Sequence, residues 1–406
     1  MSEQEFLDAL VFRRVQYRYR KRVFQFDLSQ SLFSSAGVDN GTNLLLAMIA
    51  EELEPDDYAR VVDLGSGTGT LGIPLAGTAN ADLVAIDRDA RAVAFTERNA
   101  RTNGIERVQA LNALILADDA AQERELIVSN LPAKAGEAVI RMLVTQLARR
   151  ATAAGGTAAV VIVKPLAKLL ATLLGELGAS VIAERKTANH AAVIFTCSVA
   201  PEELETDQGD LALPASFLRT TATFQGPKKR YQMHTAYNLP EFDGLSYRTA
   251  LAFDLLTEHK PGGRALLYGC GQGHVAVGLG QRGGQKLELA IADRDLLALR
   301  VAGANLASNG MHAADAITVA TPGMLASRFE PGSFAWVVVD DDPAAGSRWN
   351  EEIASLADLL DDAGRLLVIS RSTTVSRLQR LAGKRLRQLS ERRMHGFRAS
   401  LLAPRR

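Results

Sequence analysis

The segment "VVDLGSGTGT" (residues 61–70) decides the fold of this chain. Glycines at alternate positions, Gly65, Gly67 and Gly69, permit positive φ and leave no Cβ between the backbone and a ligand. The apolar run before them predicts a buried strand, and "LGIPLAG" (71–77) begins a helix behind them. A helix N-terminus offers free N–H groups and a positive dipole end to an anionic group. The segment therefore predicts a ligand-binding turn between a strand and a helix.

Two cofactors fit such a turn: a nicotinamide dinucleotide and S-adenosylmethionine. Gly67, Gly69 and Gly72 satisfy the dinucleotide fingerprint GxGxxG, and Asp87 ends the next predicted strand, where it suits the ribose diol of either cofactor. Asp63 separates the two, because a carboxylate ahead of the loop repels a pyrophosphate but can pair with the ammonium of a methionine moiety. The methyl donor is therefore favoured. An NAD(P)-dependent oxidoreductase is the alternative, although no Tyr-Lys or His-based hydride site stands out.

Composition describes an ordinary globular protein without a dominant charge. The 406 residues contain 46 Lys and Arg against 46 Asp and Glu, so no overall field attracts nucleic acid. Cys197 and Cys270 are the only cysteines and have no CxxC spacing, which argues against a disulfide framework and a zinc cluster. The acidic N-terminus is unlike a signal peptide, and no apolar run is long enough to cross a bilayer. We expect a cytoplasmic protein without a membrane span or a metal site. A monomer is favoured, although the sequence does not determine the oligomeric state.

The two halves of the chain resemble one another. Four segments recur in the same order: 37–52 in 244–259, 61–69 in 265–273, 85–104 in 291–310, and 127–133 near 338. Between the halves, residues 201–215 contain five acidic residues, two prolines and no base, which is typical of a linker. We therefore predict an internal duplication, with a domain over 1–200, an acidic linker over 201–215 and a second domain over 216–406.

Each half alternates short apolar runs with helical periodicity, which predicts α/β domains with mostly parallel, doubly wound sheets. "RVVDL", "DLVAID", "ELIVSN" and "TAAVVIVK" are the strands predicted in the first half. Ligands of such sheets bind at the carboxyl ends of the strands.

"DLGSGTG", "AIDRD" and "NLPA", in this order and spacing, resemble the motifs of class I S-adenosylmethionine-dependent methyltransferases. The tandem arrangement, with "FQFDLSQSLFSSAGVDNGTNLLL" (24–46) ahead of the glycine loop, is similar to the bacterial ribosomal RNA guanine-N2 methyltransferases that carry two such domains. The resemblance covers most of the chain, weakly in the second half. It implies two tandem Rossmann-like methyltransferase domains, the second of them degenerate, and S-adenosylmethionine as the cofactor.

The resemblance also implies roles for individual residues on the donor side. Asp63 and the loop Gly65, Gly67 and Gly69 would hold the methionine part of the donor, and Asp87 its ribose. The residues assigned to the adenine are Asn112 and Ala113, at its edge, and Arg88, which would pack on the ring.

"SNLPA" (129–133) is the predicted catalytic motif. An exocyclic amine is conjugated with its base and is a poor nucleophile, so hydrogen-bond acceptors are needed to turn its lone pair towards the methyl group. The side-chain oxygen of Asn130 and the carbonyl of Leu131 would be these acceptors, Asn130 also bordering the donor, and Pro132 fixes the loop. In the family the motif usually reads Asn-Pro-Pro-aromatic; here Leu131 replaces the first proline and Ala133 replaces the aromatic that stacks on the base. Either another aromatic substitutes, or the acceptor is a protein side chain or a small molecule.

The second half lacks most of these polar groups, so binding and chemistry are assigned to the first half. This is the reverse of the order associated with the ribosomal RNA enzymes. The predicted replacements are Leu267 for Asp63, Ser246 for Asp39, Arg248 for Gly41, Asp341 for Asn130, and Thr321-Pro322 for Asn112-Ala113. The carboxylates Asp340 to Asp342 lack histidines or other ligands at metal-binding spacing and predict a solvated loop.

Three basic segments in this otherwise neutral protein favour a polyanionic partner, and the resemblance implies that this partner is ribosomal RNA or a ribosomal subunit. They are "FRRVQYRYRKR" (12–22), which includes Arg18 and Arg20, "GPKKRY" (226–231), and residues 371–406, with eleven Lys and Arg against one acid. Lys134, directly after "NLPA", is placed to touch a substrate phosphate. Solvated faces are the competing interpretation of these segments. His190 and His234 have no carboxylate or cysteine pattern and are expected to be structural or at the surface.

Overall fold

A computed structural model describes residues 3–116, 124–198, 213–341 and 348–405. The chain divides into two compact units. The first contains the described residues of Val11–Gln208 and of Pro214–Phe217. The second contains those of Leu218–Arg406, of Gly209–Leu213 and of Met1–Leu10. Most of the expected acidic linker, residues 201–212, lies outside the described residues.

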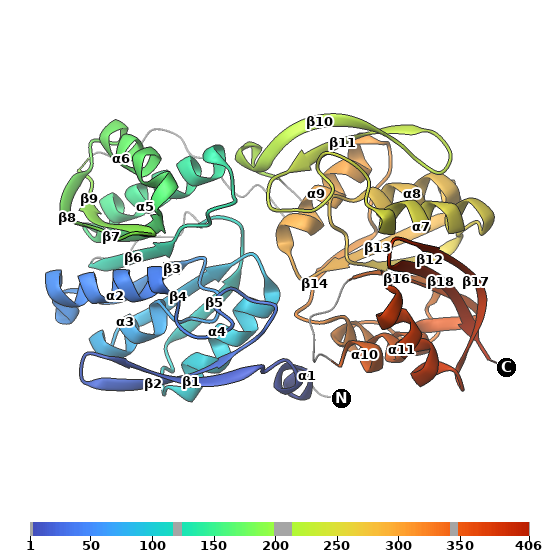
Figure 1. Cartoon of the computed structure of the whole chain (residues 1–406), viewed down its shortest axis with the longest axis horizontal. Helices are drawn as coiled ribbons and strands as arrows, with labels where there is room; N and C mark the ends of the chain where they lie inside the picture. The colour runs from blue at the N-terminus through green and yellow to red at the C-terminus, as the bar shows by residue number, and fades with distance from the viewer. Residues whose placement is uncertain (1–2, 117–123, 199–212, 342–347, 406) are drawn as a thin grey trace. The chain divides into compact units, whose positions relative to one another are not determined.

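The first unit is a seven-stranded sheet of order β5-β4-β3-β6-β7-β9-β8. Its strands are β3 (Arg60–Leu64), β4 (Asp82–Asp87), β5 (Val108–Asn112), β6 (Glu125–Asn130), β7 (Thr157–Val163), β8 (Ser180–Lys186) and β9 (His190–Thr196). β3 to β7 are parallel, whereas β9 is antiparallel to both of its neighbours. The helices are α2 (Asn40–Glu52), α3 (Gly72–Ala79), α4 (Ala90–Thr102), α5 (Glu137–Ala154) and α6 (Ala167–Glu176), with short 3₁₀ helices at Pro55–Asp57, Lys164–Leu166 and Ala215–Phe217 (Figure 1).

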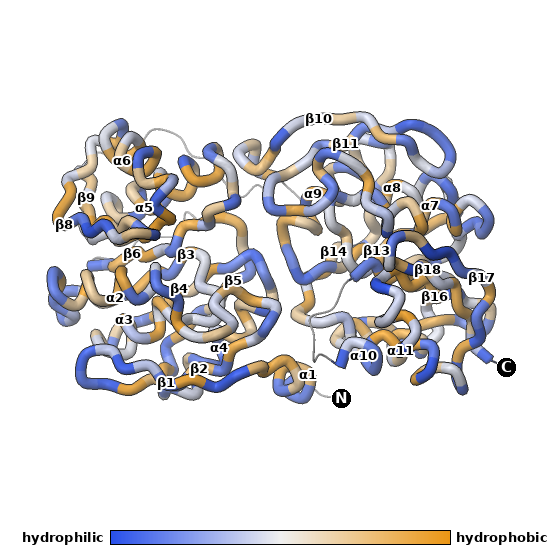
Figure 2. The backbone as a smooth tube through the Cα atoms, in the orientation of Figure 1, coloured by the Kyte–Doolittle hydropathy of each residue, from blue (hydrophilic) through white to orange (hydrophobic). Residues whose placement is uncertain are grey.

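This strand order places the site. β3 lies between β4 and β6, so the chain runs outward on one side of β3 and then on the other. Ligands of open α/β sheets bind at such a switch point, beyond the carboxyl ends of the strands. The central strands are mostly apolar, as is typical of parallel strands covered on both faces (Figure 2). The antiparallel β8–β9 pair was not predicted, because an apolar run such as "HAAVIFT" carries no information about strand direction.

The second unit repeats this topology with the order β14-β13-β12-β15-β16-β18-β17. Its strands are β12 (Gly263–Tyr268), β13 (Leu287–Asp293), β14 (Asp315–Thr318), β15 (Phe334–Asp340), β16 (Leu360–Arg371), β17 (Leu386–Met394) and β18 (Phe397–Pro404). Its helices are α7 (Tyr247–Glu258), α8 (His274–Gly283), α9 (Leu296–Ser308), α10 (Trp349–Ser355) and α11 (Ser372–Ala382), with 3₁₀ helices at Gly284–Lys286, Pro322–Ser327 and Leu356–Leu359. The predicted fold of two tandem domains with mostly parallel sheets is confirmed.

The N-terminal helix α1 (Glu3–Ala9) groups with the second unit, although its sequence position assigned it to the first domain. The ring of Phe6 lies so close to Gly323 that a Cβ there would collide with it. Apolar packing therefore decides where α1 belongs, and sequence proximity does not.

A two-stranded hairpin precedes each sheet: β1 (Arg13–Tyr19) with β2 (Arg22–Leu28), and β10 (Leu218–Gln225) with β11 (Arg230–Ala236). In β1, Tyr19 is buried and Tyr17 packs against the core, while Arg18 between them is exposed. Alternate residues of a strand face opposite sides. Tyr19 of the first basic segment is thus a core residue and Tyr17 is half-buried against the core, so base stacking by this segment stays a prediction.

Three general expectations can be compared with the structure directly. Cys197 and Cys270 are unpaired and buried. No helix in the described parts of the chain is long and apolar enough to cross a membrane. No group of three or more His, Cys, Asp or Glu side chains that could hold a metal ion occurs among the described residues.

Candidate functional site

The glycine loop of the first unit leaves space on its outer side. Gly65, Gly67 and Gly69 all have positive φ, at 82°, 58° and 79°. A Cβ added to Gly65 or Gly67 would meet no atom within 4 Å, whereas one at Gly69 would collide with Ile73. The first two glycines therefore border open space, and the third is required by packing.

Asp63 is buried beneath this loop with half of its carboxylate unsatisfied. It is 1% exposed, and its Oδ2 accepts a hydrogen bond of 2.8 Å from the backbone N–H of Gly72. Its buried Oδ1 has no partner. Burial raises the pKa of Asp63 to about 7, against the lowering effect of the Gly72 N–H, and repulsion from Asp87 raises it further. A buried acceptor without a donor is costly, and a cationic ligand group would satisfy it.

Asp87, at the end of β4, holds the loop from the other side. Its Oδ2 accepts from the N–H of Gly67 and its Oδ1 from that of Asp89, both at 2.9 Å. Burial raises the pKa of Asp87 to about 6; the N–H of Asp89 opposes this shift, and the charge of Asp89 adds to it. Each carboxylate oxygen can accept a second hydrogen bond. Asp87 can thus bind a diol while it fixes the loop.

Asn112 and Ala113 follow β5, next to Asp87. The side-chain N–H₂ of Asn112 donates to the carbonyls of Asp87 and Arg88 at 3.1 and 2.8 Å, and the N–H of Ala113 donates to Asp87 at 3.1 Å. These bonds tie the end of β5 to the turn after β4. The structure therefore brings Arg88, Asn112 and Ala113 together beside Asp87, and their contact with an adenine stays a prediction.

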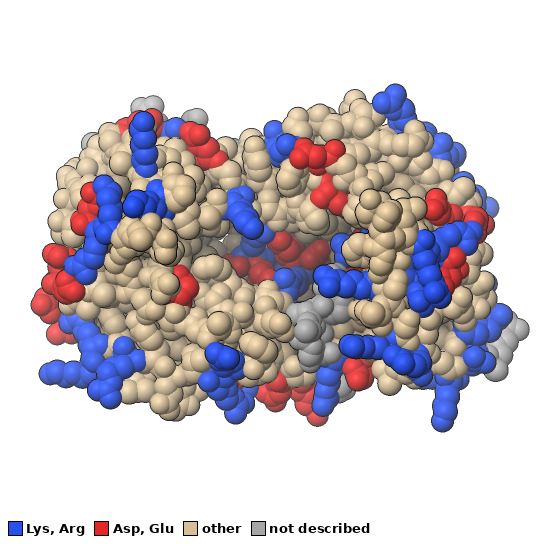
Figure 3. All heavy atoms as spheres, viewed as in Figure 1, with Lys and Arg blue, Asp and Glu red and all other residues tan. Residues whose placement is uncertain are grey.

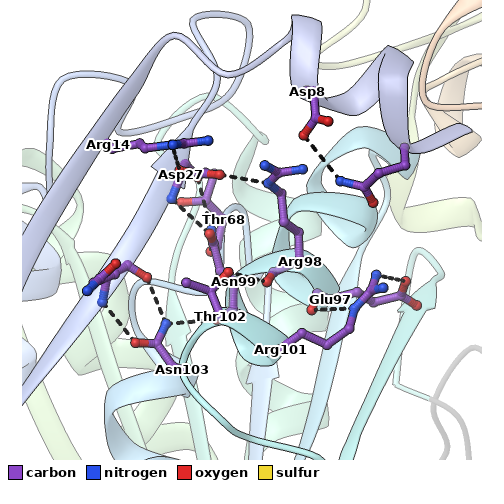
Figure 4. A network of polar contacts seen from close by, with 12 residues as sticks. Asp8, Arg14, Asp27, Thr68, Glu97, Arg98, Asn99, Arg101, Thr102 and Asn103 are labelled. Carbon is purple, nitrogen blue, oxygen red and sulfur yellow. Dashed lines mark hydrogen bonds and ion pairs between the residues drawn. The ribbon is translucent and has the colours of Figure 1, made fainter.

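An asparagine clamp ties the glycine loop to the β1–β2 hairpin (Figure 4). The buried side chain of Asn99, on α4, accepts from the N–H of Asp27 at 2.8 Å and donates to the carbonyls of Asp27 and Thr68 at 3.0 and 2.8 Å. Arg14 and Arg98 bind the carboxylate of Asp27 at 2.9 and 2.7 Å. The loop is thereby held by a side chain that the motif does not contain.

The second unit has the same clamp. Asn305 on α9 accepts from the N–H of His234 at 2.7 Å and donates to the carbonyls of His234 and Gln272, each at 2.8 Å. The clamp thus belongs to the fold that the two units share. It is the same in the unit with the predicted donor site and in the degenerate unit.

Asn130 ends β6 with its amide orientation fixed. Its Nδ2 lies 3.3 and 3.4 Å from the carboxylate oxygens of Asp39 and 3.2 Å from Oγ1 of Thr42. Asp39 is held in turn as the N-cap of α2: it accepts from the N–H groups of Gly41 and Thr42 and from the hydroxyls of Thr42 and Ser34. Because the N–H₂ side faces a carboxylate, Oδ1 of Asn130 is the end left to accept a hydrogen bond from a ligand.

The residues after Asn130 form a rigid turn. The side chain of Leu131 is buried, and its N–H donates to Val161 at 2.9 Å, while no described residue donates to its carbonyl. Pro132 and Lys134 are exposed. The two acceptors predicted for catalysis, Asn130 Oδ1 and the Leu131 carbonyl, are therefore neighbours with acceptor capacity left.

Asp39 and Thr42 were not among the residues predicted for the site. The position of His190 next to them was not predicted either. The imidazole of His190 lies against Gly41, where an added Cβ would be 3.2 Å from the ring. The loss of Asp39 in the second half, where Ser246 replaces it, was the signal that could have identified it. His190 left no such signal, because it comes from β9.

Arg20 lies away from these residues. Its guanidinium donates to the carbonyls of Ala50 and Leu53 at 3.0 and 2.7 Å, at the C-terminal end of α2. Asp39 caps the opposite end of this 13-residue helix, about 20 Å away at 1.5 Å per residue. Arg18 is exposed on β1. The structure does not bring these two arginines to Asn130, and an RNA contact by either stays a prediction.

The corresponding place in the second unit is filled. Leu267 replaces Asp63, and a Cβ at Gly269, the counterpart of Gly65, would collide with the carbonyl of Asp340. Arg248, which replaces Gly41, extends to Asp340 with its Nε 3.3 Å from Oδ1. The main chain at Asp340 thus occupies the space that is open at Gly65, whereas Gly271, the counterpart of Gly67, still borders open space. With Leu267 in place of Asp63 and an ion pair at the position of Gly41, this copy is degenerate.

Sheet register corrects two of the proposed replacements. Asp63 pairs with Val128 and Leu267 with Val338, so Asn130 corresponds to Asp340, one residue before the predicted Asp341. The pairs Asp87–Asn112 and Asp293–Thr318 likewise make Thr318 the counterpart of Asn112, three residues before the predicted Thr321. Segments of unequal length precede β6 and β15, which explains the first error, whereas the same number of residues separates the two partners in the Asp87–Asn112 and Asp293–Thr318 pairs, so the second error has no such cause. Of the three predicted loop carboxylates, Asp341 accepts from Trp349 Nε1 at 2.8 Å, and Asp342 lies outside the described residues.

The comparisons with known proteins agree with this geometry. The model of the "methyltransferase small domain" family matches residues 24–187, a span that contains every donor-side residue above. Protein YbxB of Bacillus subtilis, which is uncharacterized, is 30% identical over 141 residues, 34% of this chain and 69% of YbxB. The ribosomal RNA small subunit methyltransferase C of Chromohalobacter salexigens is 39% identical over 74 residues, but these are 18% of this chain and 22% of that enzyme.

One solved structure shares the fold of the whole chain. It is the T. thermophilus 16S rRNA N2 G1207 methyltransferase (RsmC) in complex with AdoMet and guanosine, with a TM-score of 0.66 at 17% identity, covering 98% of this chain and 99% of that one. Fold, glycine loop and paired carboxylates define a class I S-adenosylmethionine-dependent methyltransferase. The chain belongs to the methyltransferase small-domain family. The oxidoreductase alternative is thereby excluded.

Proposed function

We propose that the first unit transfers a methyl group from S-adenosylmethionine to an exocyclic amino group of a base in ribosomal RNA, most specifically N2 of guanine. The observation that carries this proposal is the fixed amide of Asn130. Its N–H₂ faces Asp39, so that its oxygen is left for an N–H donor such as an amine.

On the donor side, the cofactor would supply an electrophilic methyl on a sulfonium centre. Asp63 would pair its unsatisfied Oδ1 with the ammonium group, and the open side of Gly65 and Gly67 would admit the methionine chain. Asp87 would bind the ribose hydroxyls. Arg88, Asn112 and Ala113, gathered beside it, would border the adenine.

On the acceptor side, Asn130 Oδ1 and the Leu131 carbonyl would accept the two N–H bonds of the amine. Both bonds pull the lone pair out of conjugation and direct it at the methyl carbon. The cofactor would supply the methyl group, its sulfur keeping the electron pair of the broken C–S bond, and the nitrogen that forms the new N–C bond would release a proton to solvent. Fixed orientation of this kind supplies roughly 7–11 kcal/mol in favourable cases, and Pro132 keeps the turn rigid.

Ribosomal RNA as the acceptor is supported by the relative named as a small-subunit methyltransferase and by the fold of RsmC. On this proposal the degenerate second unit binds RNA or acts as a scaffold, Lys134 contacts a substrate phosphate, and the enzyme takes part in rRNA processing in the cytoplasm. A second candidate keeps the donor and methylates a protein side chain or a small molecule. It is favoured by Ala133, which stands where the family has a stacking aromatic.

Nucleoside mass spectrometry of ribosomal RNA from cells with and without the gene tests the proposal. Loss of one N2-methylguanosine, restored by wild type and not by Asn130→Ala, is the expected result. Calorimetry should show that Asn130→Ala still binds the donor, through Asp63 and Asp87, which separates a catalytic defect from misfolding. Ribosomal RNA of unchanged methylation would shift the assignment to the second candidate.

A further inference from the structure

Helix α11 carries a row of cations that no carboxylate neutralises. Arg377, Arg380 and Lys384 are exposed, and none of them forms an ion pair with a described residue. Arg377 and Arg380, at positions i and i+3, lie on one face of α11, and Lys384 lies in the turn two residues beyond the end of the helix. We call these three residues the α11 cations. The space-filling view shows Lys and Arg gathered over α11 and the neighbouring β17 (Figure 3).

Three other arginines of this basic segment have acidic partners. Arg385 pairs with Asp358, Arg392 with Glu258, and Arg393 with Glu391. Local pairing thus accounts for part of the positive charge of the segment, whereas the α11 cations are exposed without an acidic partner among the described residues.

The first unit provides an internal comparison. Its helix α6 occupies the same place after the fifth strand of the sheet, yet it exposes one cation, Lys168, and one acid, Glu176. Glu176 is paired with Arg141. A shared fold therefore does not require the cations of α11, which belong to the second unit alone.

We propose that the α11 cations bind the phosphate backbone of RNA and that the degenerate unit holds the substrate through them. Along the helix axis Arg377 and Arg380 are spaced by about 4.5 Å, which is comparable with the rise of one to two nucleotides of a strand at about 3.4 Å each. The row contains no acid, so it suits a polyanion of uniform charge. The proposal rests on RNA as the acceptor.

Anisotropy of a labelled 20-nucleotide polyuridine with the full-length protein tests this inference, because that probe contains no guanine and cannot be the methyl acceptor. The triple variant R377Q/R380Q/K384Q keeps strong helix formers at exposed positions. Removal of three phosphate contacts should make the negative slope of the log binding constant against log salt concentration shallower by about 2. It should also weaken binding at least tenfold at low salt.

A matched control is K260Q/K286Q/R328Q, which removes three exposed cations from elsewhere on the same unit. Its affinity should stay within threefold of wild type, and both triple variants should keep wild-type donor affinity by calorimetry. Equal losses in both variants, or no loss in the α11 variant, would overturn the inference. If no RNA is methylated but the α11 variant alone loses polyuridine binding, the proposed function fails and the surface assignment stands.

Discussion

The Asp63→Asn variant tests the donor site most directly. Asparagine has the same shape and can still accept from the Gly72 N–H, as Oδ2 of Asp63 does. It cannot carry the charge that the unsatisfied Oδ1 would offer to the ammonium group of the donor. The variant therefore removes one charge and little else.

The pKa of Asp63 determines the size and the sign of the effect. At about 7 in the donor-free protein, the carboxyl is about one tenth ionised at pH 6 and about nine tenths at pH 8. A cationic ligand favours the ionised form, so donor binding should release protons, and affinity should rise about tenfold from pH 6 to pH 8. At pH 8 the variant should bind at least about thirtyfold more weakly, since an unpaired buried charge partner costs about 2–5 kcal/mol.

The raised pKa of Asp63 makes donor affinity rise with pH, but it makes the stability of the donor-free protein fall with pH. A folded-state pKa above the unfolded value of about 3.9 means that Asp63 favours the folded state below that pH, and this contribution is lost as pH rises through about 7. The loss for the donor-free protein is on the order of 4 kcal/mol. Asp63→Asn should lack it, so the variant should gain stability relative to wild type between pH 5 and pH 8.

Calorimetry with S-adenosylmethionine in buffers of different ionisation enthalpy measures affinity and proton release together, and urea titrations measure stability. Leu267→Met, at the equivalent position of the second unit, is the control and should bind donor as wild type does. If Asp63→Asn bound donor with wild-type affinity and wild-type pH dependence, the assignment of Asp63 to the ammonium group would be refuted.

Three further variants test the rest of the site. Asp39→Asn should lower kcat roughly tenfold to a hundredfold at unchanged donor affinity, because a charged hydrogen bond worth about 1.5–3 kcal/mol no longer orients the Asn130 amide. The exchange D39N/N130D should recover part of the rate in a methyl-transfer assay. No recovery would contradict this orienting role. Phe33, 69% exposed one residue before the Asp39-bound Ser34, is the candidate for the missing stacking aromatic. Phe33→Ala should raise the KM for RNA by about five- to a hundredfold without changing the urea midpoint, whereas an unchanged KM would leave the base without this platform. Asn99→Ala should lower the free energy of unfolding by about 2–4 kcal/mol in urea titrations and should also lower the affinity for the donor. Asn305→Ala should lower stability alone. Equal donor affinities in the two variants would show that the clamp does not support the glycine loop.

The sequence indicated the donor side of the site well, because that side is local in the chain. The glycines, Asp63 and Asp87 lie on one strand–loop–helix unit and the next strand. Their spacing in the sequence therefore predicts how they are arranged in space. The same patterning predicted both parallel sheets. It did not predict the β8–β9 direction or the place of α1, since apolar runs and helical periodicity describe burial and say nothing about the partner.

The acceptor side depended on tertiary structure. Asn130 was recognisable, but its amide orientation comes from Asp39, ninety-one residues earlier in the chain, and His190 reaches Gly41 from the last strand pair.

The sequence by itself thus determined the class of fold and the donor, and it predicted which copy binds the donor, since these follow from residue type and local spacing. Only the tertiary structure decided which end of the Asn130 amide is left to accept a hydrogen bond, what fills the space at Gly269 in the second copy, and which arginines have no acidic partner. Those properties depend on side chains that distant segments bring within hydrogen-bonding distance.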